Sequence, residues 1–259
     1  MTPSRIAAVV VVILAVAVGA YFFWPSPPPP PPPAPPRVEA PPAAPPAPQG
    51  PQNPVPAPSE APPLPSLKDS DPALRDALST LIGSSALRLY LVPEEIVRHI
   101  VATIDNLPRK SYAARLNPVK GPGGLLATTG QGDSLAIAPA NAERYAPYVR
   151  VFTAVDTGKL VAAYVHLYPL FQQAYEDLGY PNGYFNDRLV EVIDHLLATP
   201  DVKGPIRLVV PHVLYEYADP DLQSRSAGQK LLIRMGSENA AKVKAKLREI
   251  RDRVAKARP

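Results

Sequence analysis

The residues between positions 25 and 66 contain 22 of the 37 prolines in this 259-residue chain, with an unbroken run from Pro27 to Pro33. Proline fixes φ and has no amide hydrogen to donate, so this segment cannot form a helix or a sheet. Its preferred conformation is polyproline II, which rises about 3.1 Å per residue and would stretch over roughly 130 Å here. We predict a disordered, semi-rigid polyproline linker over residues 25–66. A ligand for proline-binding modules is the alternative.

An uninterrupted apolar run of nineteen residues precedes the linker; it begins at Ile6 and ends at Trp24. As a helix this run would reach about 28 Å, close to the hydrocarbon thickness of a bilayer, and it carries no charge. We therefore predict a transmembrane helix over residues 6–24 that acts as a signal-anchor, after a short tail of residues 1–5. A cleaved signal peptide is the alternative, because Val18-Gly19-Ala20 resembles a small-residue cleavage site.

Charge around the predicted span favours one orientation. Arg5 and the terminal amine precede it, whereas Arg37 is the first basic residue after it. The positive-inside bias predicts a cytoplasmic N-terminus and a periplasmic C-terminal body in the inner membrane. The chain has no cysteine, which excludes disulfides and thiolate metal sites.

Residues 67–259 are long enough for one domain with a real core, and their apolar residues recur at helical spacing. We predict a mainly α fold: one globular multi-helix domain with a small β-hairpin and short strands. The hairpin is expected within residues 125–137 and the short strands at 206–210 and 213–217. The expected helices cover residues 71–82, 84–91, about 93–106, 142–155, 158–178, 186–198, 226–235 and 237–256. In the first, Leu74, Leu78 and Leu81 belong to the apolar stripe, Ser70 is the expected cap, and Gly83 ends the helix. Pro93-Glu94-Glu95 is expected to open the third helix, with acid in its first turn. The helix over 158–178 is apolar all round, so it should lie in the middle of the domain, bent at Pro169.

Three short motifs have structural explanations. Asp156-Thr157-Gly158 matches the catalytic triplet of aspartic proteases, but helical periodicity on both sides predicts a helix cap instead. Ser226 and Lys230 are four residues apart, where Ser-Lys hydrolases use a spacing of three, so Ser226 is predicted to cap a helix. The glycines that follow Lys120 lack the lysine and hydroxyl of a phosphate-binding loop.

The four histidines give no metal signature. Glu95 and His99, and Glu191 and His195, lie four residues apart on helix faces, as amphipathic helices often place them. Nothing resembles the His-Glu-x-x-His pattern, and we predict no catalytic, metal or cofactor residues.

The densest polar segment is the turn that runs from Tyr180 to Arg188 into a predicted helix. Its candidate ligand- or partner-binding residues are Tyr180, Tyr184, Asn186, Asp187 and Arg188. The same residues would also build a fixed corner, with Asn186 as the cap and Asp187 at the positive end of the helix dipole. The sequence favours the structural corner. If a pocket exists, it is expected here or along the stripe of Tyr164, Tyr168 and Tyr175.

The last helix carries the excess positive charge of the chain. Residues 237–258 hold eight Lys or Arg and three acids, a surplus of five, while the whole chain has a net charge of +4. The basic residues between Lys242 and Arg258 could meet an anionic surface, whereas Val243, Leu247, Ile250 and Val254 form an apolar seam. A solvated helix end is the alternative. Nucleic acid is not an expected partner.

Several segments resemble a proteobacterial domain-of-unknown-function family, the one numbered three thousand and fourteen. They are LVPEEIVR at 91–98, TIDNLPR at 103–109, YPLFQQAY at 168–175, LGYPNGYFNDRL at 178–189, ADPDL at 218–222 and SAGQK at 226–230. The resemblance covers nearly all of residues 67–253. It implies an anchored envelope protein of a Gram-negative bacterium, and it implies no catalytic residues.

These features together predict an uncharacterised single-pass inner-membrane protein. Its periplasmic helical domain, held on a proline-rich stalk, would bind an envelope partner or polymer without catalysis. The alternative function is an envelope hydrolase or small-ligand receptor with a site at Tyr184 to Arg188, where Glu191 or Asp194 could assist.

Overall fold

The computed structural model describes residues 50–56, 63–111 and 113–255. Contacts divide the chain into residues 1–47 and 48–259, and every described residue belongs to the second unit. The predicted span over residues 6–24 and most of the predicted linker therefore lie outside the described residues. Within the described part, no helix combines the length and the apolar character that crossing a bilayer requires.

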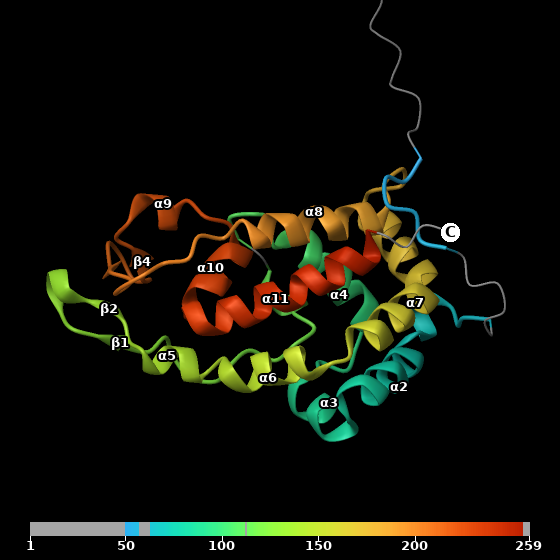
Figure 1. The fold of residues 1–259 in the computed structure, drawn as a ribbon, viewed down its shortest axis with the longest axis horizontal. Helices are drawn as coiled ribbons and strands as arrows, with labels where there is room; N and C mark the ends of the chain where they lie inside the picture. The colour runs from blue at the N-terminus through green and yellow to red at the C-terminus, as the bar shows by residue number, and fades with distance from the viewer. Residues whose placement is uncertain (1–49, 57–62, 112, 256–259) are drawn as a thin grey trace, which may run out of the picture. The chain divides into compact units, whose positions relative to one another are not determined.

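The unit is mainly helical, as predicted, with two small antiparallel strand pairs (Figure 1). In the described residues the α-helices are α2 (Asp71–Ile82), α3 (Ser84–Tyr90), α4 (Ile96–Asn106), α5 (Ala140–Glu143), α6 (Ala146–Ala154), α7 (Thr157–Asp177), α8 (Phe185–Leu197), α9 (Pro220–Gln223), α10 (Ala227–Arg234) and α11 (Ser237–Val254). The strand pairs are β1 (Thr128–Thr129) with β2 (Ala136–Ile137), and β3 (Leu208–Val209) with β4 (Glu216–Tyr217).

Two helices organise the packing. The last helix, α11, contacts α8, α6, α7 and α10, and Figure 1 shows it running between α8 and α6. The predicted apolar seam of α11 is confirmed, since Val243 and Leu247 pack in a core cluster and Val254 is 2% exposed. The long helix α7 contacts α4, α11, α8 and α2, which confirms its predicted central place, and it continues through Pro169 to Asp177.

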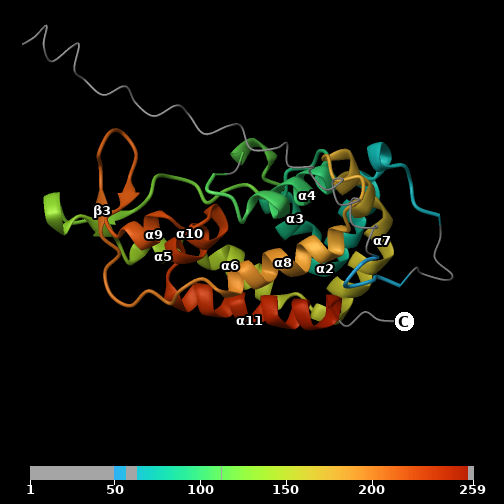
Figure 2. The ribbon, with the colours of Figure 1, turned by 90° about the horizontal axis from the view of Figure 1, so that it is seen from above.

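A second core cluster joins α2, α4 and α7. Ile96, Val97 and Val101 of α4 are at most 1% exposed, and they pack with Phe171 of α7 and with Phe185 at the start of α8. In Figure 2 these helices gather at the end of the unit opposite the strands. Burial of these side chains is the main stabilising contribution at that end of the unit.

The two strand pairs form one small β region with its own cluster of Leu208, Tyr217, Leu222 and Ile233. The amide of Ile137 donates to the carbonyl of Ile206 at 2.9 Å, which links β2 to the segment before β3. The hairpin within 125–137 and the pairing around Pro211 are thus confirmed, although the strands are shorter than predicted.

Three local predictions fail. Ser70 precedes α2 as predicted, but its hydroxyl donates to the carbonyl of Leu67 at 2.8 Å instead of capping the helix. The acids of Pro93-Glu94-Glu95 do not enter a first turn, because α4 begins only at Ile96. Glu95 has a φ of 48°, and the carboxylate of Asp71 accepts the amides of Glu95 and Ile96 at 2.9 Å each.

The third failure is the helix predicted over residues 142–155, which is divided into α5 and α6. Pro147 lies in the first turn of α6 and has no amide to donate back to residue 143, so the first helix ends before it. The carbonyl of Ala142 accepts instead from the amide of Tyr145 at 3.1 Å.

Candidate functional site

The turn from Tyr180 to Arg188 is fastened to α7. The Gln172 side chain donates to the carbonyl of Gly183 at 2.8 Å and accepts from the amide of Phe185 at 2.8 Å. A Cβ on Gly183 would lie 2.9 Å from a ring carbon of Tyr175, so glycine permits the close approach of this turn. The rings of Tyr175 and Tyr180 stack with centroids 4.6 Å apart.

Asn186 does not cap α8, which corrects the sequence prediction. The helix begins at Phe185, and the amide of Phe185 is satisfied by Gln172 from the neighbouring helix. Asn186 is fully buried; its Oδ1 accepts from the Tyr164 hydroxyl at 3.1 Å, and its Nδ2 donates to the carbonyls of Asn53 at 2.8 Å and Val254 at 3.1 Å. Asn186 thus joins four chain segments.

Asp187 holds residues 52 and 53, which lie within the proline-rich segment. It lies in the first turn of α8, where the helix dipole favours an acid as predicted. Its carboxylate accepts the amides of Gln52 at 2.9 Å and Asn53 at 2.6 Å, and the Asn53 side chain at 3.0 Å. Residues 52 and 53 belong to the segment predicted as linker, and they are fixed to the helical body here.

Tyr180 and Arg188 meet at a buried carboxylate that the sequence analysis did not single out. Asp105 of α4 is 2% exposed, and it accepts from Arg188 Nε at 3.0 Å, Arg109 Nη2 at 2.6 Å and the Tyr180 hydroxyl at 3.2 Å. Arg188 also pairs with Glu191 at 2.9 Å. This Asp105 hub therefore ties α4 to α8 through Arg188 and to the turn before α8 through Tyr180.

The acids around the two arginines of the hub favour the charged form of each guanidinium. The hydrogen bond and charge of Asp105 raise the pKa of the Arg109 guanidinium above its ordinary value. Burial lowers the pKa of Arg188, but its contacts with Glu191 and Asp105 outweigh burial and raise it. Among the described residues, the Tyr184 side chain forms no hydrogen bond, and its carbonyl accepts the amide of Arg188 at 3.2 Å.

The five candidate residues thus form two groups, with Tyr184 between them. Asn186 and Asp187 hold residues 52–53, while Tyr180 and Arg188 converge on Asp105. Their hydrogen bonds are made within the protein, which favours the structural corner over a ligand site at these side chains. Of the tyrosine stripe named above, only Tyr164 lines one of the cavities described below.

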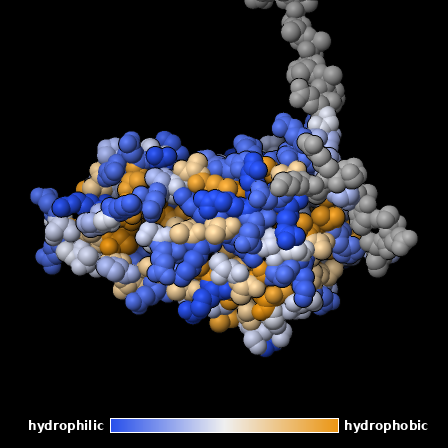
Figure 3. Space-filling model, viewed as in Figure 1, coloured by the Kyte–Doolittle hydropathy of each residue, from blue (hydrophilic) through white to orange (hydrophobic). Residues whose placement is uncertain are grey.

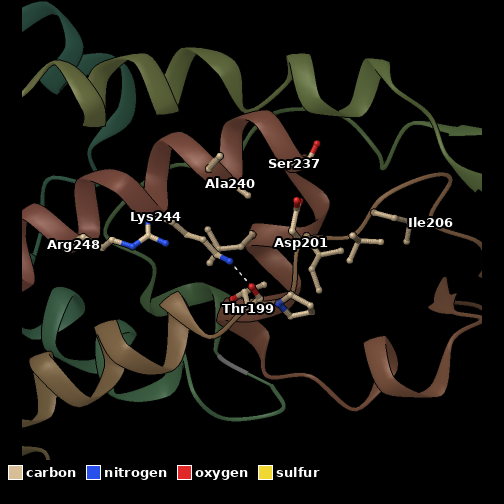
Figure 4. Close-up of a pocket in the computed structure, with 12 residues that line it drawn as sticks. Thr199, Asp201, Ile206, Ser237, Ala240, Lys244 and Arg248 are labelled. Atoms are coloured by element: carbon tan, nitrogen blue, oxygen red, sulfur yellow. Dashed lines mark hydrogen bonds between the residues drawn. The ribbon is translucent and has the colours of Figure 1, made fainter.

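A cavity of about 240 Å³ lies between α10, α11 and the segment after α8 (Figure 4). Its lining is mixed, and it is called the polar cavity below because charged residues stand beside its apolar ones. Ser237, Lys244 and Arg248 line it from one face of α11, opposite Thr199 and Asp201. The Lys244 ammonium donates to the carbonyl of Thr199, drawn as the dashed line in Figure 4. Burial, with the nearby charge of Arg248, lowers the pKa of Lys244. Two cations beside one acid could accept an anionic group.

Sequence reasoning missed this cavity. Lys244 and Arg248 were counted only as part of a basic face, and no motif marks residues 199–206. The spacing of Lys244 and Arg248 gave no signal, because Lys242 and Lys246 form the same like-charge pair on α11 and do not line the cavity.

The other motifs have structural roles. Asp156 caps α7 by accepting the amide of Lys159 at 2.8 Å, and this bond lowers the pKa of its carboxyl. Ser226 caps α10 as predicted, accepting the amide of Gln229 at 3.2 Å, and it also bonds to Nε2 of His195 at 2.8 Å. In the described residues no group of three or more His, Asp or Glu is placed to hold a metal ion.

Much of the basic face of α11 contacts the protein itself. Lys246 is 7% exposed and donates to the Thr157 hydroxyl at 2.8 Å and the carbonyl of Val155. Lys242 pairs with Glu238 at 2.7 Å, and Arg251 pairs with Asp194. Part of the basic face is thus already paired within the protein. Lys256 and Arg258 lie outside the described residues.

The fold is a helical body in which the corner from Tyr180 to Arg188 and the Asp105 hub join separate segments of the same chain. The chain belongs to DUF3014, a family described as proteins of unknown function, whose model matches residues 96–251. The match begins at the first residue of α4 and ends within α11, so it spans the Asp105 hub and the corner. Searches of curated proteins and of solved structures find no match to this chain.

Proposed function

We propose that this protein is a non-enzymatic binding module of the bacterial envelope, tethered to the inner membrane. Residues 6–24 cross the membrane once with the N-terminus in the cytoplasm. The prolines of residues 25–66 hold the helical body in the periplasm, where it engages an envelope protein or polymer. The apolar run and the proline tract support this layout, because only together do they give an anchor and reach.

The attachment of residues 52–53 to α8 carries the proposal. Asp187 and Asn186 grip backbone groups on both sides of Asn53, so the stalk leaves the body from one fixed place. A freely hinged tether would need no such contacts. Fixing the exit would keep one face of the body turned toward the stalk and the opposite elements free for a partner.

The polar cavity beside α11 is the best contact point for that partner. Arg248 is exposed, and Lys244 at its side has only a carbonyl as a hydrogen-bond partner among the described residues. Acidic groups of an envelope protein or polymer would pair with these cations. A hydrolase or small-ligand receptor at Tyr184 to Arg188 is less well supported, because the acids there already bind backbone amides and arginines.

Site-specific photo-crosslinking in cells tests the proposal. A photoreactive residue at Ala241, on the rim of the polar cavity, should capture an envelope partner, and Arg248→Glu should abolish the capture. The photoreactive residue placed at Asn182 tests whether a partner contacts the corner. The photoreactive residue placed at Ser84 of α3 is the matched surface control. Shortening residues 25–49, the part of the stalk before the attachment at residues 52–53, to about ten residues should remove the Ala241 product if the stalk supplies reach. Equal capture from Ala241 and Ser84, or no effect of stalk length, would contradict the proposal.

A further inference from the structure

Two apolar cavities lie against each other in the helical body, and one of them reaches Phe185 at the start of α8. One has a volume of about 320 Å³ and the other of about 340 Å³. They share five lining residues, Leu78 and Leu81 of α2, Ile100 of α4, Phe152 of α6 and Leu160 of α7. Because the wall between them is common, they form one two-lobed site, called the apolar cavity below.

The side chains that line the apolar cavity carry few polar atoms, and the hydroxyls among them belong to Tyr90, Tyr148 and Tyr164. Every lining side chain is aliphatic or aromatic, or is proline. Tyr164 carries a hydroxyl, but it donates to Asn186 and is thereby satisfied elsewhere. In the second lobe the rings of Tyr90 and Tyr148 contact each other with centroids 4.7 Å apart. Water is a poor occupant of such a space, since it needs two to four polar partners.

The apolar cavity can be reached from outside. Leu78, Leu81, Phe152 and Leu160 are all only partly buried, although they face one another across α2, α6 and α7. In Figure 3, hydrophobic residues come to the surface over the region of α6, α3 and α2. The site is therefore an accessible space and not a sealed packing defect.

The volume and the apolar lining of the cavity determine which kind of ligand it can hold. An extended peptide would leave its amides and carbonyls unpaired against this lining. A hydrocarbon chain has no such cost. A cavity of about 150 Å³ holds benzene, so one lobe accommodates roughly twelve carbons.

We infer that the apolar cavity between α2, α4, α6 and α7 binds a single alkyl chain of a fatty acid or lipid. The inference goes beyond the proposed function and does not depend on the tether or on the polar cavity. The headgroup stays outside the lining, and the chain length decides the affinity.

Photolabelling of the full chain in lipid nanodiscs tests the inference. The probe is dodecanoic acid with a diazirine in its chain, and labelled peptides are mapped by mass spectrometry. Ala163 and Ala77 line the first lobe, so Ala163→Leu and Ala77→Leu fill it without removing packing. Each should lower labelling of residues 161–171 and 185–189, which line the first lobe alone, about tenfold, because several carbon contacts of the probe are lost there. Peptides from residues 6–24 give an internal measure of probe dissolved in the bilayer.

The matched control is Ala162→Leu, one residue away on the exposed side of α7, which should leave the labelling unchanged. The melting temperature of each variant should stay level or rise, since filling a cavity adds packing. Unlabelled dodecanol should compete as well as dodecanoate, and hexanoate should compete poorly. Labelling confined to residues 6–24, equal labelling of the filled variants, or equal competition by hexanoate would overturn the inference.

Discussion

The carboxylate of Asp187 accepts the backbone amide of Asn53 at 2.6 Å and the side-chain amide of the same residue at 3.0 Å. These residues are 134 positions apart in the chain. The contact joins the proline-rich segment to the first turn of α8, and α8 in turn is held to α4 by the Asp105 hub. A pull on residues 50–56 would therefore be transmitted to the centre of the helical body.

Removal of the Asp187 carboxylate should release this segment. In Asp187→Ala the amides of Gln52 and Asn53 lose their acceptor, so their hydrogen exchange should accelerate while exchange in α4 and α7 stays slow. The free energy of unfolding should fall by about 1–3 kcal/mol, the usual cost of leaving such donors unpaired. Hydrogen-exchange mass spectrometry measures the change. Asp76→Ala on the exposed face of α2 is the control, and unchanged exchange at residues 52–53 would refute the contact.

The Asp105 hub should be essential for stability. Asp105→Ala removes the carboxylate that accepts from Arg188 Nε and from the Tyr180 hydroxyl and leaves Arg188 only its contacts with Glu191 and the backbone, so it should cost about 3–5 kcal/mol. Asp177→Ala removes an acid from a half-exposed pair with Arg98 and should cost about 0–1 kcal/mol. Urea denaturation compares the two variants. A similar loss in both would mean that Asp105 contributes no more than a surface ion pair.

The Asp156 cap of α7 should make the stability of the protein depend on pH in the acidic range. The pKa of Asp156 is lowered in the folded protein, first by the hydrogen bond from the Lys159 amide, from an ordinary value of 3.8. Its ionised form therefore stabilises the fold above that value, and the contribution is lost as pH falls through the folded pKa. Asn also caps helices, so Asp156→Asn removes only the charge.

We expect the Asp156→Asn variant to be less stable than the wild type near neutral pH and equally stable at the acid end. Urea midpoints measured across this range give the difference. Other acids with lowered pKa values, such as Glu249, are present in both proteins and cancel. A difference that stayed constant as the pH falls below about 4 would contradict the cap.

Gly228 should resist substitution although it lies in a helix. A Cβ there would meet a methyl carbon of Leu196 at 2.6 Å and the carbonyl oxygen of Leu107 at 3.0 Å. Gly228→Ala should therefore lower stability by about 1–3 kcal/mol, despite the better helix propensity of alanine. Gly121→Ala, where a Cβ meets open space, is the control for a thermal melt. A melting temperature raised by Gly228→Ala would show that α10 can move away from α8.

The periodic spacing of apolar residues predicted most of the helices, because each helix buries one face. The spacing of Leu74, Leu78 and Leu81 and the punctuation by Gly83 locate α2 correctly, and Asp156 and Ser226 locate two caps. These signals are local. The start of α4 is not, because its amides are capped by Asp71 from another helix, and no pattern near Glu95 reveals that partner.

The site was harder to predict for the same reason. The segment from Tyr180 to Arg188 stood out by its polar density, but the partners that decide its role lie at Asn53, Asp105 and Gln172. Asn186 has the side chain of a cap, yet Gln172 already satisfies the helix and Asn186 binds other segments. The apolar cavity carries no sequence signal, because its lining residues are indistinguishable from ordinary core positions until the helices are packed.

The central claim is that the body lies outside the cytosol on an anchored stalk. The chain has no cysteine, so one introduced cysteine is the only thiol of this protein that a maleimide can label. A single cysteine at the exposed Ser84 of α3 is treated with a membrane-impermeant maleimide in intact spheroplasts. The account predicts full labelling before lysis, in protein recovered with the membrane fraction. Labelling only after lysis, or recovery of the protein in the soluble fraction, would contradict it.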